Sequence, residues 1–433
     1  MTQRYDAVVI GAGVIGAGIA LELARGGRSV CLVDRSGAVG SGSTSASSAI
    51  VRFHYSTRDG VCAAWESARR WLDWEAYLGF RDPAGMASFV RTGALVLDSP
   101  GLPTAQTLAL FDALGVPYER FDASQLADRF PALDTGAYGP PVPVTDERFF
   151  NGPHGRLTGY LTPDAGYIDD PALAAQNLAH AATAHGAVLR LRSEVVGVTR
   201  DGGRVAGVAL ADGTMLAAPL VVNAAGPWSS QLNAMAGVGA DFTLALRPLR
   251  QEVHAVPAPT GFDLGTGAFL TDPDLGVYLR PHAGGTLIVG GMEPDCDPLT
   301  WLDDPDEVDG HVTAEAWEAQ TLRAARRLPD LPVPPRPSGI VGVYDVTDDW
   351  IPIYDRTGLP GFYVAIGTSG NQFKNAPLVG ELMARLIDAV ESGHDHDADP
   401  LQVVGRWSGM SVDLGHYSRL RAAHSASSHT VMG

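Results

Sequence analysis

The sequence predicts an α/β fold, α+β overall, in which a parallel-sheet domain is interleaved with a domain built on an antiparallel sheet. Three observations predict it. A strand, a glycine-rich turn, a helix and a second strand follow one another within residues 5–35. Apolar strands that run into small-residue turns recur at 220–228 and 362–377. Strand-rich stretches, chiefly within 242–292, separate these units.

The first unit reads YDAVVIGAGVIGAGIALELARGGRSVCLVDR. Residues 7–10 form a short apolar run typical of a buried strand, and residues 14–25 have helical spacing. Residues 29–33 form a second apolar strand that leads into Asp34. Three glycines stand between the first strand and the helix in the pattern G-x-G-x-x-G: Gly11, Gly13 and Gly16.

Each residue type in this unit has a physical reason. Gly11 permits the tight turn, Gly13 lets a pyrophosphate approach the backbone, and Gly16 lets the helix pack close to the strand. The helix N-terminus offers N–H groups to phosphates, and the Asp34 carboxylate can accept hydrogen bonds from a ribose 2′-OH. The unit therefore predicts a Rossmann-like domain that binds a dinucleotide. FAD and NAD both remain open at this point, and a glycine-rich turn in an unrelated α/β protein is the alternative.

Composition excludes several classes of partner. The formal net charge is −18, so neither nucleic acid nor an anionic membrane surface is an expected partner, and an anionic small ligand must meet particular cations. The three cysteines form no C-x-x-C pair and no disulfide framework, which is typical of a reducing cytoplasm. No uncharged apolar run of about 18 residues occurs, so we expect a cytoplasmic protein without a membrane span.

The cations are divided unevenly between lysine and arginine. Together these two residue types number 31, yet the chain contains a single lysine, Lys374. A lysine that persists against such a bias is a candidate for a task that arginine cannot perform, such as placing a compact point charge. The alternative is a surface lysine without a function.

Up to residue 238 the chain alternates loops, helices and strands. A hydroxyl-rich loop spans 36–56, a helix with an aromatic stripe spans 61–80, and a Pro- and Gly-rich connection spans 131–166. Alanine content predicts a helix over Ala172–His185. A strand, a turn around Thr92-Gly93 and a second strand are predicted over 89–97. Further strands are predicted at 187–198, 204–210 and 220–223, and further helices at 104–114 and 124–130.

The remainder is strand-rich until its last helix. Strands are predicted at 242–256, 266–271, 276–281, 286–292, 339–346 and 362–366. An acidic stretch at 301–310 is predicted to be a solvated surface loop, and helices are predicted at 313–328 and 378–391. The tail from 394 has no strong periodicity, and its alternation over His394–Asp397 predicts a solvated loop and not a metal site.

We therefore expect discontinuous domains. The Rossmann-like domain is predicted to comprise residues 1–85, 150–238 and 340–395. The substrate-binding domain is predicted to comprise 86–149 and 239–339, and residues 396–433 form a C-terminal tail.

Several motifs follow one another in an order shared with one family of flavoproteins. They lie between residue 5 and about residue 392: GAGVIG, Asp34-Arg35, the Ser/Thr loop to Ile-Val-Arg, GYIDDP, AAGPW and GTSGNQFKNAP. In these motifs the chain resembles the D-amino-acid oxidase-like family, and within it the branch of sarcosine oxidase and glycine oxidase. The resemblance implies FAD as the cofactor and an FAD-binding domain interleaved with an antiparallel-sheet substrate domain. It also implies oxidation of an amine or amino acid to an imine that water hydrolyses.

The resemblance implies where FAD would lie. Gly11, Gly13 and Gly16 would take the pyrophosphate, and Asp34, with Arg35 beside it, would take the adenosine ribose. The rest of the cofactor site would comprise Thr44, Ser45, Ser48, Ile50, Val195, Gly226, Trp228, Gly370, Asn371, Gln372, Phe373 and Lys374.

Two cations are expected at the substrate. Arg52 and Lys374 resemble the pair that sarcosine oxidases use on the substrate carboxylate, the arginine as a bidentate fork and the lysine as a point charge. Positive charge is also needed near the flavin N1 edge, because reduction leaves an anion there. Tyr278, Arg280 and His254 are weaker candidates for lining the pocket, with packing or a structural salt bridge as the alternative for each.

Three positions depart from the sarcosine oxidase pattern. Gly342 stands where the covalent enzymes carry a flavin-linked cysteine, so FAD is expected to be non-covalent. About Ile288 aligns with the lysine that activates oxygen, and Ala49 stands where an arginine precedes Arg52 by three residues. O2 and another electron acceptor therefore both remain open, and a dehydrogenase is an alternative to an oxidase.

The predicted function is that of an FAD-dependent amine or amino-acid oxidase or dehydrogenase. It would oxidise the C–N bond of a carboxylate-bearing N-methyl, secondary or primary amine by hydride transfer to flavin N5. A 2-hydroxy-acid dehydrogenase of the same fold and a non-catalytic flavin-binding or assembly protein are the alternatives. Arg52 together with Lys374 favours an enzyme, and self-association into an oligomer stays open.

Overall fold

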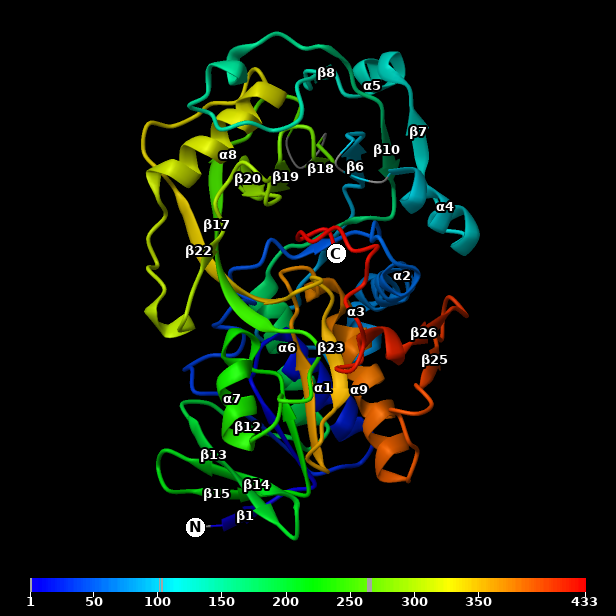
Figure 1. Ribbon diagram of the computed structural model, residues 1–433, viewed down its shortest axis with the longest axis vertical. Coiled ribbons are helices and arrows are strands. Elements are labelled where there is room, and N and C mark those ends of the chain that lie inside the picture. The colour runs from blue at the N-terminus through cyan, green and yellow to red at the C-terminus, as the bar shows by residue number, and fades with distance from the viewer. Residues whose placement is uncertain (1, 101, 103, 263–266) are drawn as a thin grey trace.

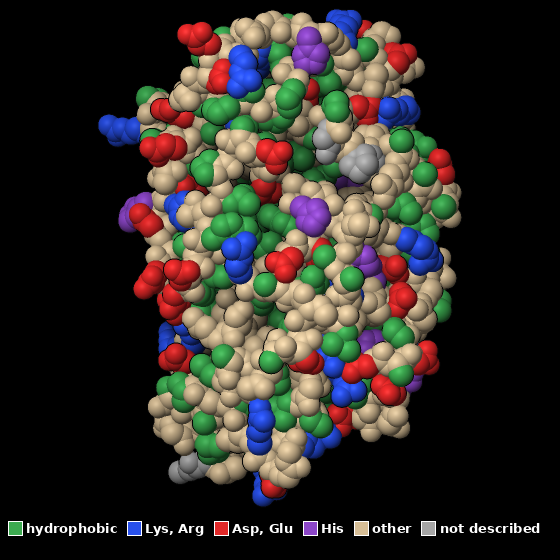
Figure 2. Space-filling model, in the orientation of Figure 1, with side chains coloured by type: hydrophobic (Ala, Val, Ile, Leu, Met, Phe, Trp, Pro, Cys, Tyr) green, Lys and Arg blue, Asp and Glu red, His purple; other side chains and the backbone are tan. Residues whose placement is uncertain are grey.

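The computed structural model describes residues 2–100, 102, 104–262 and 267–433 and contains two large sheet systems, one above the other in Figure 1. The lower part holds the N-terminal glycine-rich unit, and the upper part holds the large antiparallel sheet. On the face shown in Figure 2, Lys and Arg side chains are interspersed with Asp and Glu side chains. In the described ranges, no helix is long and apolar enough to cross a bilayer.

A six-stranded sheet forms the centre of the lower part. Its strands lie in the order β12 (Val188–Arg190), β3 (Val30–Val33), β2 (Ala7–Ile10), β16 (Leu220–Asn223), β24 (Phe362–Ile366) and β23 (Ile353–Arg356). The first five strands are parallel, and β23 runs antiparallel to β24. Every residue of β2, β3, β16 and β24 is buried, because helices cover one face and a second sheet covers the other.

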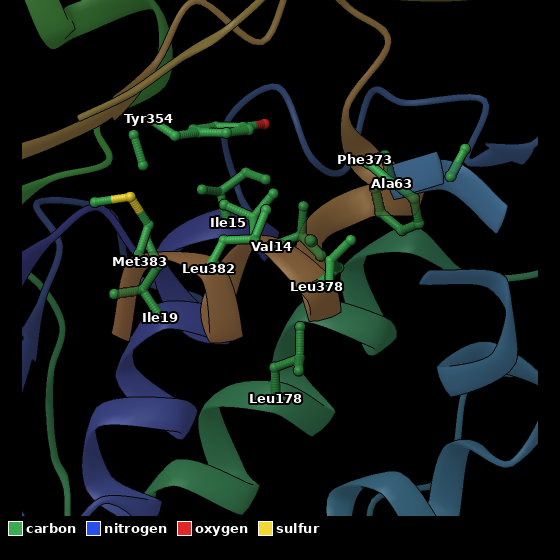
Figure 3. Packing of buried hydrophobic residues seen from close by; sticks show 14 of the residues in the cluster. Val14, Ile15, Ile19, Ala63, Leu178, Tyr354, Phe373, Leu378, Leu382 and Met383 are labelled. Atoms are coloured by element: carbon green, nitrogen blue, oxygen red, sulfur yellow. The ribbon is translucent and has the colours of Figure 1, made fainter. Parts of the chain in front are cut away.

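Three helices cover one face of this sheet: α1 (Val14–Arg25), α6 (Pro171–Ala184) and α9 (Ala376–Glu391). Figure 3 shows apolar side chains of these helices packed together: Val14, Ile15 and Ile19 of α1, Leu178 of α6, and Leu378, Leu382 and Met383 of α9. The contact between α1 and α9 needs glycine on both helices. A Cβ on Gly18 would lie 2.8 Å from the Ala376 oxygen, and a Cβ on Gly380 would lie 2.4 Å from the Gly18 oxygen.

The opposite face is covered by α7 (Ser229–Ala236) and a four-stranded sheet. Its strands lie in the order β1 (Thr2–Arg4), β15 (Met215–Ala217), β14 (Arg204–Leu210) and β13 (Val195–Asp201). The single strand predicted over 187–198 is wrong, because the chain leaves β12 of one sheet and enters β13 of the other. At this break Arg192 has a left-handed backbone (φ 51°), and its amide donates to the Ser36 carbonyl (2.9 Å).

The upper part is a nine-stranded sheet. Its order is β21 (Thr300–Trp301), β17 (Leu246–Pro257), β20 (Thr286–Gly291), β19 (Val277–His282), β18 (Phe269–Asp272), β6 (Ala94–Leu97), β10 (Gly159–Thr162) and β7 (Glu119–Phe121), with β22 (Gly339–Thr347) also beside β17. All neighbours are antiparallel except β18 and β6. The predicted strand over 266–271 starts at residue 266, which lies outside the described residues.

Helix α8 (Ala314–Arg327) packs on the strands of this sheet, where it buries Trp317. The helices α4 (Thr104–Leu114) and α5 (Ala123–Arg129) lie at the other end of the upper part (Figure 1). The single helix predicted over 61–80 is two helices, α2 (Arg58–Leu72) and α3 (Trp74–Leu78). The chain leaves helical geometry between them at Asp73 (φ −113°, ψ 49°).

The remaining elements are short. Strands β4 (Ile50–Val51), β11 (Gly166–Ile168) and β5 (Phe89–Val90) form one sheet, and β8 (Gly136–Ala137) pairs with β9 (Gly155–Arg156). The 3₁₀ turns are η1 (Glu147–Phe150), η2 (Gly226–Trp228), η3 (Pro305–Glu307), η4 (Phe373–Asn375) and η5 (Leu414–Tyr417).

The tail packs on the lower part although its sequence has no strong periodicity. It forms a hairpin of β25 (Gln402–Val404) and β26 (Ser411–Asp413). Ion pairs then fasten it: Arg419 lies 3.1 Å from Asp355 and 2.7 Å from Asp397, and Arg421 lies 2.9 Å from Asp349. In the part of the chain that the structure describes, no three His, Cys, Asp or Glu side chains are grouped as metal ligands.

Candidate active site

One cavity is lined by both parts of the molecule, and it begins at the glycine-rich turn. Gly11 leaves β2 with a left-handed backbone (φ 103°), and a Cβ there would lie 2.4 Å from the Ala224 oxygen. A Cβ on Gly16 would lie 1.9 Å from the Gly11 oxygen, so only glycine lets α1 follow β2 this closely. Gly16 therefore serves the close packing of α1 against the turn, while Gly11 lines the cavity.

Gly13 and Thr44 line the cavity where α1 begins. A Cβ on Gly13 would meet only one described atom within 4 Å outside its own chain neighbours, the Thr44 hydroxyl oxygen at 3.1 Å. The same hydroxyl accepts a hydrogen bond from the Val14 amide (3.0 Å). The N-cap residue is Gly13, which has no side chain, and the first turn of α1 has no acidic side chain, so the positive end of the helix dipole faces the cavity.

Asp34 is held at the edge of the cavity by two backbone amides. Its carboxylate accepts hydrogen bonds from the amides of Ala12 and Ser36, both at 2.7 Å. Each carboxylate oxygen has a further lone pair, so Asp34 can also accept a hydrogen bond from a ligand hydroxyl. The segment that connects β12 to β13 forms the next wall, and Val195, the first residue of β13, lines the cavity there.

The acidic stretch 301–310 contacts residues at this end of the cavity, and Asp306 is exposed there, in agreement with the predicted solvated surface loop. The Asp306 carboxylate pairs with the Arg35 guanidinium (2.9 Å) and accepts a hydrogen bond from the Trp228 indole (2.8 Å). The guanidinium also lies over the Trp228 ring, 4.5 Å from its centroid. Arg35, Trp228 and the neighbouring Gly226 all line the cavity. The cluster formed by Asp306, Arg35 and Trp228 therefore lies along one side of it.

The hydroxyl-rich loop contributes Ser48 and Ile50 to the lining. The Ser48 and Tyr278 hydroxyls are hydrogen-bonded at 2.7 Å, and burial raises the pKa of Tyr278 to about 12, so the phenol stays neutral near pH 7. Ser45 does not line the cavity, because its hydroxyl turns back to donate to the Gly42 carbonyl (3.1 Å).

The turn after β24 lines the cavity at the same sheet edge as the glycine-rich turn, because β2 and β24 both run parallel to β16 between them. Gly370 has a left-handed backbone (φ 70°), and a Cβ there would lie 2.3 Å from the Tyr344 ring. Phe373 stacks on Trp71, with ring centroids 5.7 Å apart and planes 10° apart. The whole predicted set lines the cavity: Gly370, Asn371, Gln372, Phe373 and Lys374.

The structure brings Arg52 and Lys374 to the same aromatic ring. The Arg52 guanidinium carbon lies 4.8 Å, and the Lys374 Nζ 4.9 Å, from the Tyr55 ring centroid. Burial lowers the pKa of both groups, and the charge of Arg52 lowers the pKa of Lys374 further. Lys374 donates to the Asn371 carbonyl (2.6 Å), and within the described residues neither cation lies in an ion pair with a carboxylate.

Sequence reasoning missed two features at this end of the cavity: the tail, which lines it, and Glu293, which contacts the lining residue Val431 but does not line the cavity itself. The Glu293 carboxylate accepts hydrogen bonds from the Gln251 side chain (3.1 Å) and the Val431 amide (3.0 Å), and burial raises the pKa of Glu293 to about 7. Val431 and Met432 line the cavity. No motif in the sequence indicates either feature, since Glu293 is one of several acids in MEPDCDP and the tail has no periodicity.

Two weaker candidates lie outside the cavity lining. Arg280 is buried with its guanidinium carbon 4.0 Å from the Tyr167 ring centroid, and burial lowers the pKa of Arg280 to about 10. His254 is buried with its ring 2.8 Å from the Gln320 side chain. Strand alternation in β17 turns His254 away from the cavity that its neighbour Val253 lines, so the expectation that His254 lines the pocket is wrong.

Known proteins are similar to this chain in sequence and in fold. Residues 6–386 match the sequence model of one protein family, which is described as FAD dependent oxidoreductase. The chain belongs to the FAD dependent oxidoreductase family. It is 27% identical over 404 residues to glycine oxidase of Geobacillus kaustophilus (strain HTA426), covering 91% of this chain and 96% of that protein. It is 26% identical over 408 residues to monomeric sarcosine oxidase of Bacillus sp. (strain NS-129), covering 91% and 96%.

A solved structure shows the same fold. L-proline dehydrogenase from P. horikoshii has a TM-score of 0.74 and 24% identity to this chain, and the match covers 91% of this chain and 95% of that one. The α/β fold class and the resemblance to the D-amino-acid oxidase-like family are thereby confirmed. Membership of this FAD dependent oxidoreductase family also confirms that the chain is an enzyme and that its cofactor is FAD.

The residues of the cavity fit FAD. Gly13, whose missing Cβ leaves room beside Thr44, and the N-terminus of α1 would hold the pyrophosphate. Asp34 would hold the ribose, and Val195 would lie at the adenine. The turn of residues 370–374 would lie against the flavin ring.

Cysteines lie away from this cavity. Gly342 lines it, whereas Cys31 is buried in β3 and Cys62 in α2, and burial raises the pKa of both thiols to about 11. Cys296 lies beside Arg323, with its sulfur 3.2 Å from a guanidinium nitrogen. Non-covalent attachment of FAD stays a prediction, which release of the flavin on acid precipitation would test.

Proposed function

We propose that this enzyme oxidises the C–N bond of a carboxylate-bearing amine or amino acid to an imine, which water then hydrolyses. The observation that carries the proposal is the pair of buried cations, Arg52 and Lys374, against Tyr55 at the flavin end of the cavity. A buried cation without a counterion is costly, so an anionic ligand at this place would be favoured.

The two cations would act differently on the substrate. Arg52 would bind both carboxylate oxygens through its planar fork, and Lys374 would add a point charge from the turn that would lie against the flavin ring. Together they lower the pKa of a substrate ammonium nearby, which favours the unprotonated amine that oxidation of the C–N bond requires. FAD, when bound, supplies the two-electron acceptor for this oxidation.

Anaerobic titration of the FAD-bound protein tests the proposal. N-methyl amino acids and D- and L-amino acids are expected to bleach the flavin absorbance, and 2-hydroxy acids are not. Bleaching only by 2-hydroxy acids would make the enzyme a hydroxy-acid dehydrogenase. If no compound of either class bleaches the flavin, a binding or assembly role replaces the catalytic one.

The electron acceptor is tested separately. Ala49 and Ile288 place no cation at the two positions discussed above, so we expect slow reoxidation by O2 and fast reoxidation by an artificial dye. Stopped-flow mixing of the reduced protein with air-saturated buffer and with the dye measures both rates. Rapid reoxidation in air would contradict this expectation and make the enzyme an oxidase.

A further inference from the structure

The last residues of the tail reach the substrate end of the cavity. In Figure 1 the C-terminal stretch, drawn in red, ends between the lower and the upper parts. The tail is held at Ser427, whose hydroxyl donates to the Asp349 carbonyl (2.5 Å), and the His429 ring lies 3.1 Å from the Asp348 carbonyl. In the described residues, the segment 428–433 takes part in no ion pair, unlike the tail before it, where Arg419 and Arg421 are paired.

This segment is hydrogen-bonded to the Arg52 side chain. The guanidinium donates to the carbonyl oxygens of Val431 (2.7 Å) and Met432 (3.1 Å). The Val431 amide donates to the Glu293 carboxylate (3.0 Å). A fourth contact runs from the Ser56 hydroxyl, which donates to the carbonyl of residue 433 (2.7 Å).

Val431 thus presents the skeleton of an α-amino acid to two side chains. Its nitrogen is bound to a carboxylate and its carbonyl oxygen to a guanidinium, with one Cα between them. A free α-amino acid carries the same atoms but has a carboxylate in place of the neutral carbonyl. Charge-assisted hydrogen bonds are roughly twice as strong as neutral ones, so an amino acid is the stronger ligand for this arrangement.

We propose that Arg52 and Glu293 form an α-amino-acid subsite, in which Glu293 accepts a hydrogen bond from the substrate nitrogen, and that segment 428–433 occupies this subsite until substrate displaces it. The inference rests on the proposed function, because it takes Arg52 as the cation that binds the substrate carboxylate. Glu293 then separates an amino acid from a plain carboxylic acid, which Arg52 alone does not do.

A chain that ends at Ser427 tests the displacement. The FAD-bound protein is titrated with 2-aminoisobutyrate, which has no hydrogen on its α-carbon and is not oxidised there, and with isobutyrate, which lacks the nitrogen. Both are expected to bind the shortened protein at least about tenfold more tightly than the full chain, since a docked segment reduces the binding-competent fraction. The change in flavin absorbance measures binding. Equal or weaker binding would overturn the proposal and make the segment a permanent wall.

Glu293→Gln in the shortened chain tests the subsite itself. The amide keeps the size of the side chain but loses the charge, so the affinity for 2-aminoisobutyrate is expected to fall about tenfold. Isobutyrate has no nitrogen and is expected to bind as before, which makes it the matched control. A loss of the same size for both ligands would overturn the role of Glu293.

Hydrogen exchange on the full FAD-bound chain covers the case in which the shortened chain does not fold. Addition of 2-aminoisobutyrate, at a concentration that saturates the absorbance change, is expected to speed the exchange of the amides of residues 429–433. Unchanged or slower exchange would overturn the displacement. These measurements need no turnover, so they are independent of the bleaching assay, in which failure of the proposed function would appear.

Discussion

The two ends of the cavity are built differently: the nucleotide end, at the glycine-rich turn and Asp34, and the proposed substrate end, at Arg52 and Lys374. At the nucleotide end the polar groups are paired within short stretches, as in the two amides that hold Asp34 and the hydroxyl that holds the Val14 amide. At the substrate end several buried polar groups have no partner among the described residues: both ring nitrogens of His54, the Thr271 hydroxyl and one carboxylate oxygen of Asp345. A buried polar group left unpaired costs about 1–3 kcal/mol, so this is the end that a ligand completes.

This difference corresponds to a division between cofactor binding at one end and substrate binding at the other. A cofactor that is always the same can be met by a preformed local turn, and the glycines there are fixed by steric contact with the backbone. The substrate end instead contains two cations, one acid and backbone polar groups that come from four separate regions of the chain, near residues 52, 374, 293 and 431. Changes at the first end should therefore affect folding and FAD content, and changes at the second should affect substrate binding.

The largest effect is expected from Gly16→Ala. The new Cβ would lie 1.9 Å from the Gly11 oxygen, which is backbone and cannot move without separating α1 from β2. We expect a loss of stability of about 3 kcal/mol or more, together with loss of FAD. Urea unfolding and the flavin-to-protein absorbance ratio measure the two effects.

Gly152→Ala is the matched control for this change, because a Cβ there would meet no atom within 4 Å. Its stability is expected to stay within about 0.5 kcal/mol of wild type. A stable Gly16→Ala protein with full FAD content would show that the backbone at the nucleotide end can move to accept a side chain.

Lys374→Met is expected to have the next largest effect, and only at the substrate end. It removes the point charge beside Tyr55 and the bond to the Asn371 carbonyl but keeps an apolar chain of similar length. The affinity for an anionic substrate is expected to fall about 10- to 100-fold, with the FAD content preserved. Titration with isobutyrate measures it, and an unchanged dissociation constant would remove Lys374 from the site.

The pH dependence of stability should come partly from Glu293. Burial raises the pKa of Glu293 from 4.5 to about 7 in the folded protein. The folded state therefore holds the proton more tightly, and the resulting stability is present below the unfolded pKa and lost as pH rises through the folded one. Relative to Glu293→Gln, the wild type should lose about 1–2 kcal/mol between about pH 5 and pH 8.

Urea unfolding of both proteins at the two pH values measures this difference, and Glu293→Gln serves as the control because an amide does not titrate. Parallel pH profiles would show that Glu293 is ionised in the folded protein at both values. In that case the substrate end holds a permanent anion between Gln251 and Val431.

Asp306→Asn should have the smallest effect, and at the nucleotide end. It weakens the exposed ion pair with Arg35 but leaves an oxygen to accept from the Trp228 indole. Exposed pairs contribute about 0.2–1 kcal/mol, so FAD affinity is expected to fall no more than about fivefold. The control is Asp309→Asn, whose carboxylate contacts the exposed His311. Equal FAD dissociation constants in both variants would show that the cluster does not help to retain FAD.

Sequence reasoning succeeded where the determinants are local. Gly11 to Asp34 form one continuous unit, and its strand, turn and helix follow from spacing and residue type alone. It failed where tertiary contacts decide the outcome. The break at Arg192 depends on a hydrogen bond to Ser36 from another segment, and the orientation of His254 depends on which face of β17 meets α8.

By itself the sequence determined the fold class, the cofactor and the single lysine, because these rest on motifs and composition that do not depend on distant contacts. Only the tertiary structure decided that Arg52, Glu293 and Val431 meet. Arg52 and Val431 are 379 positions apart, and a stretch without periodicity such as 428–433 carries no local preference that would place it in the cavity. Its position depends on how the tail is bonded to Asp349 and on its hydrogen bonds with Arg52.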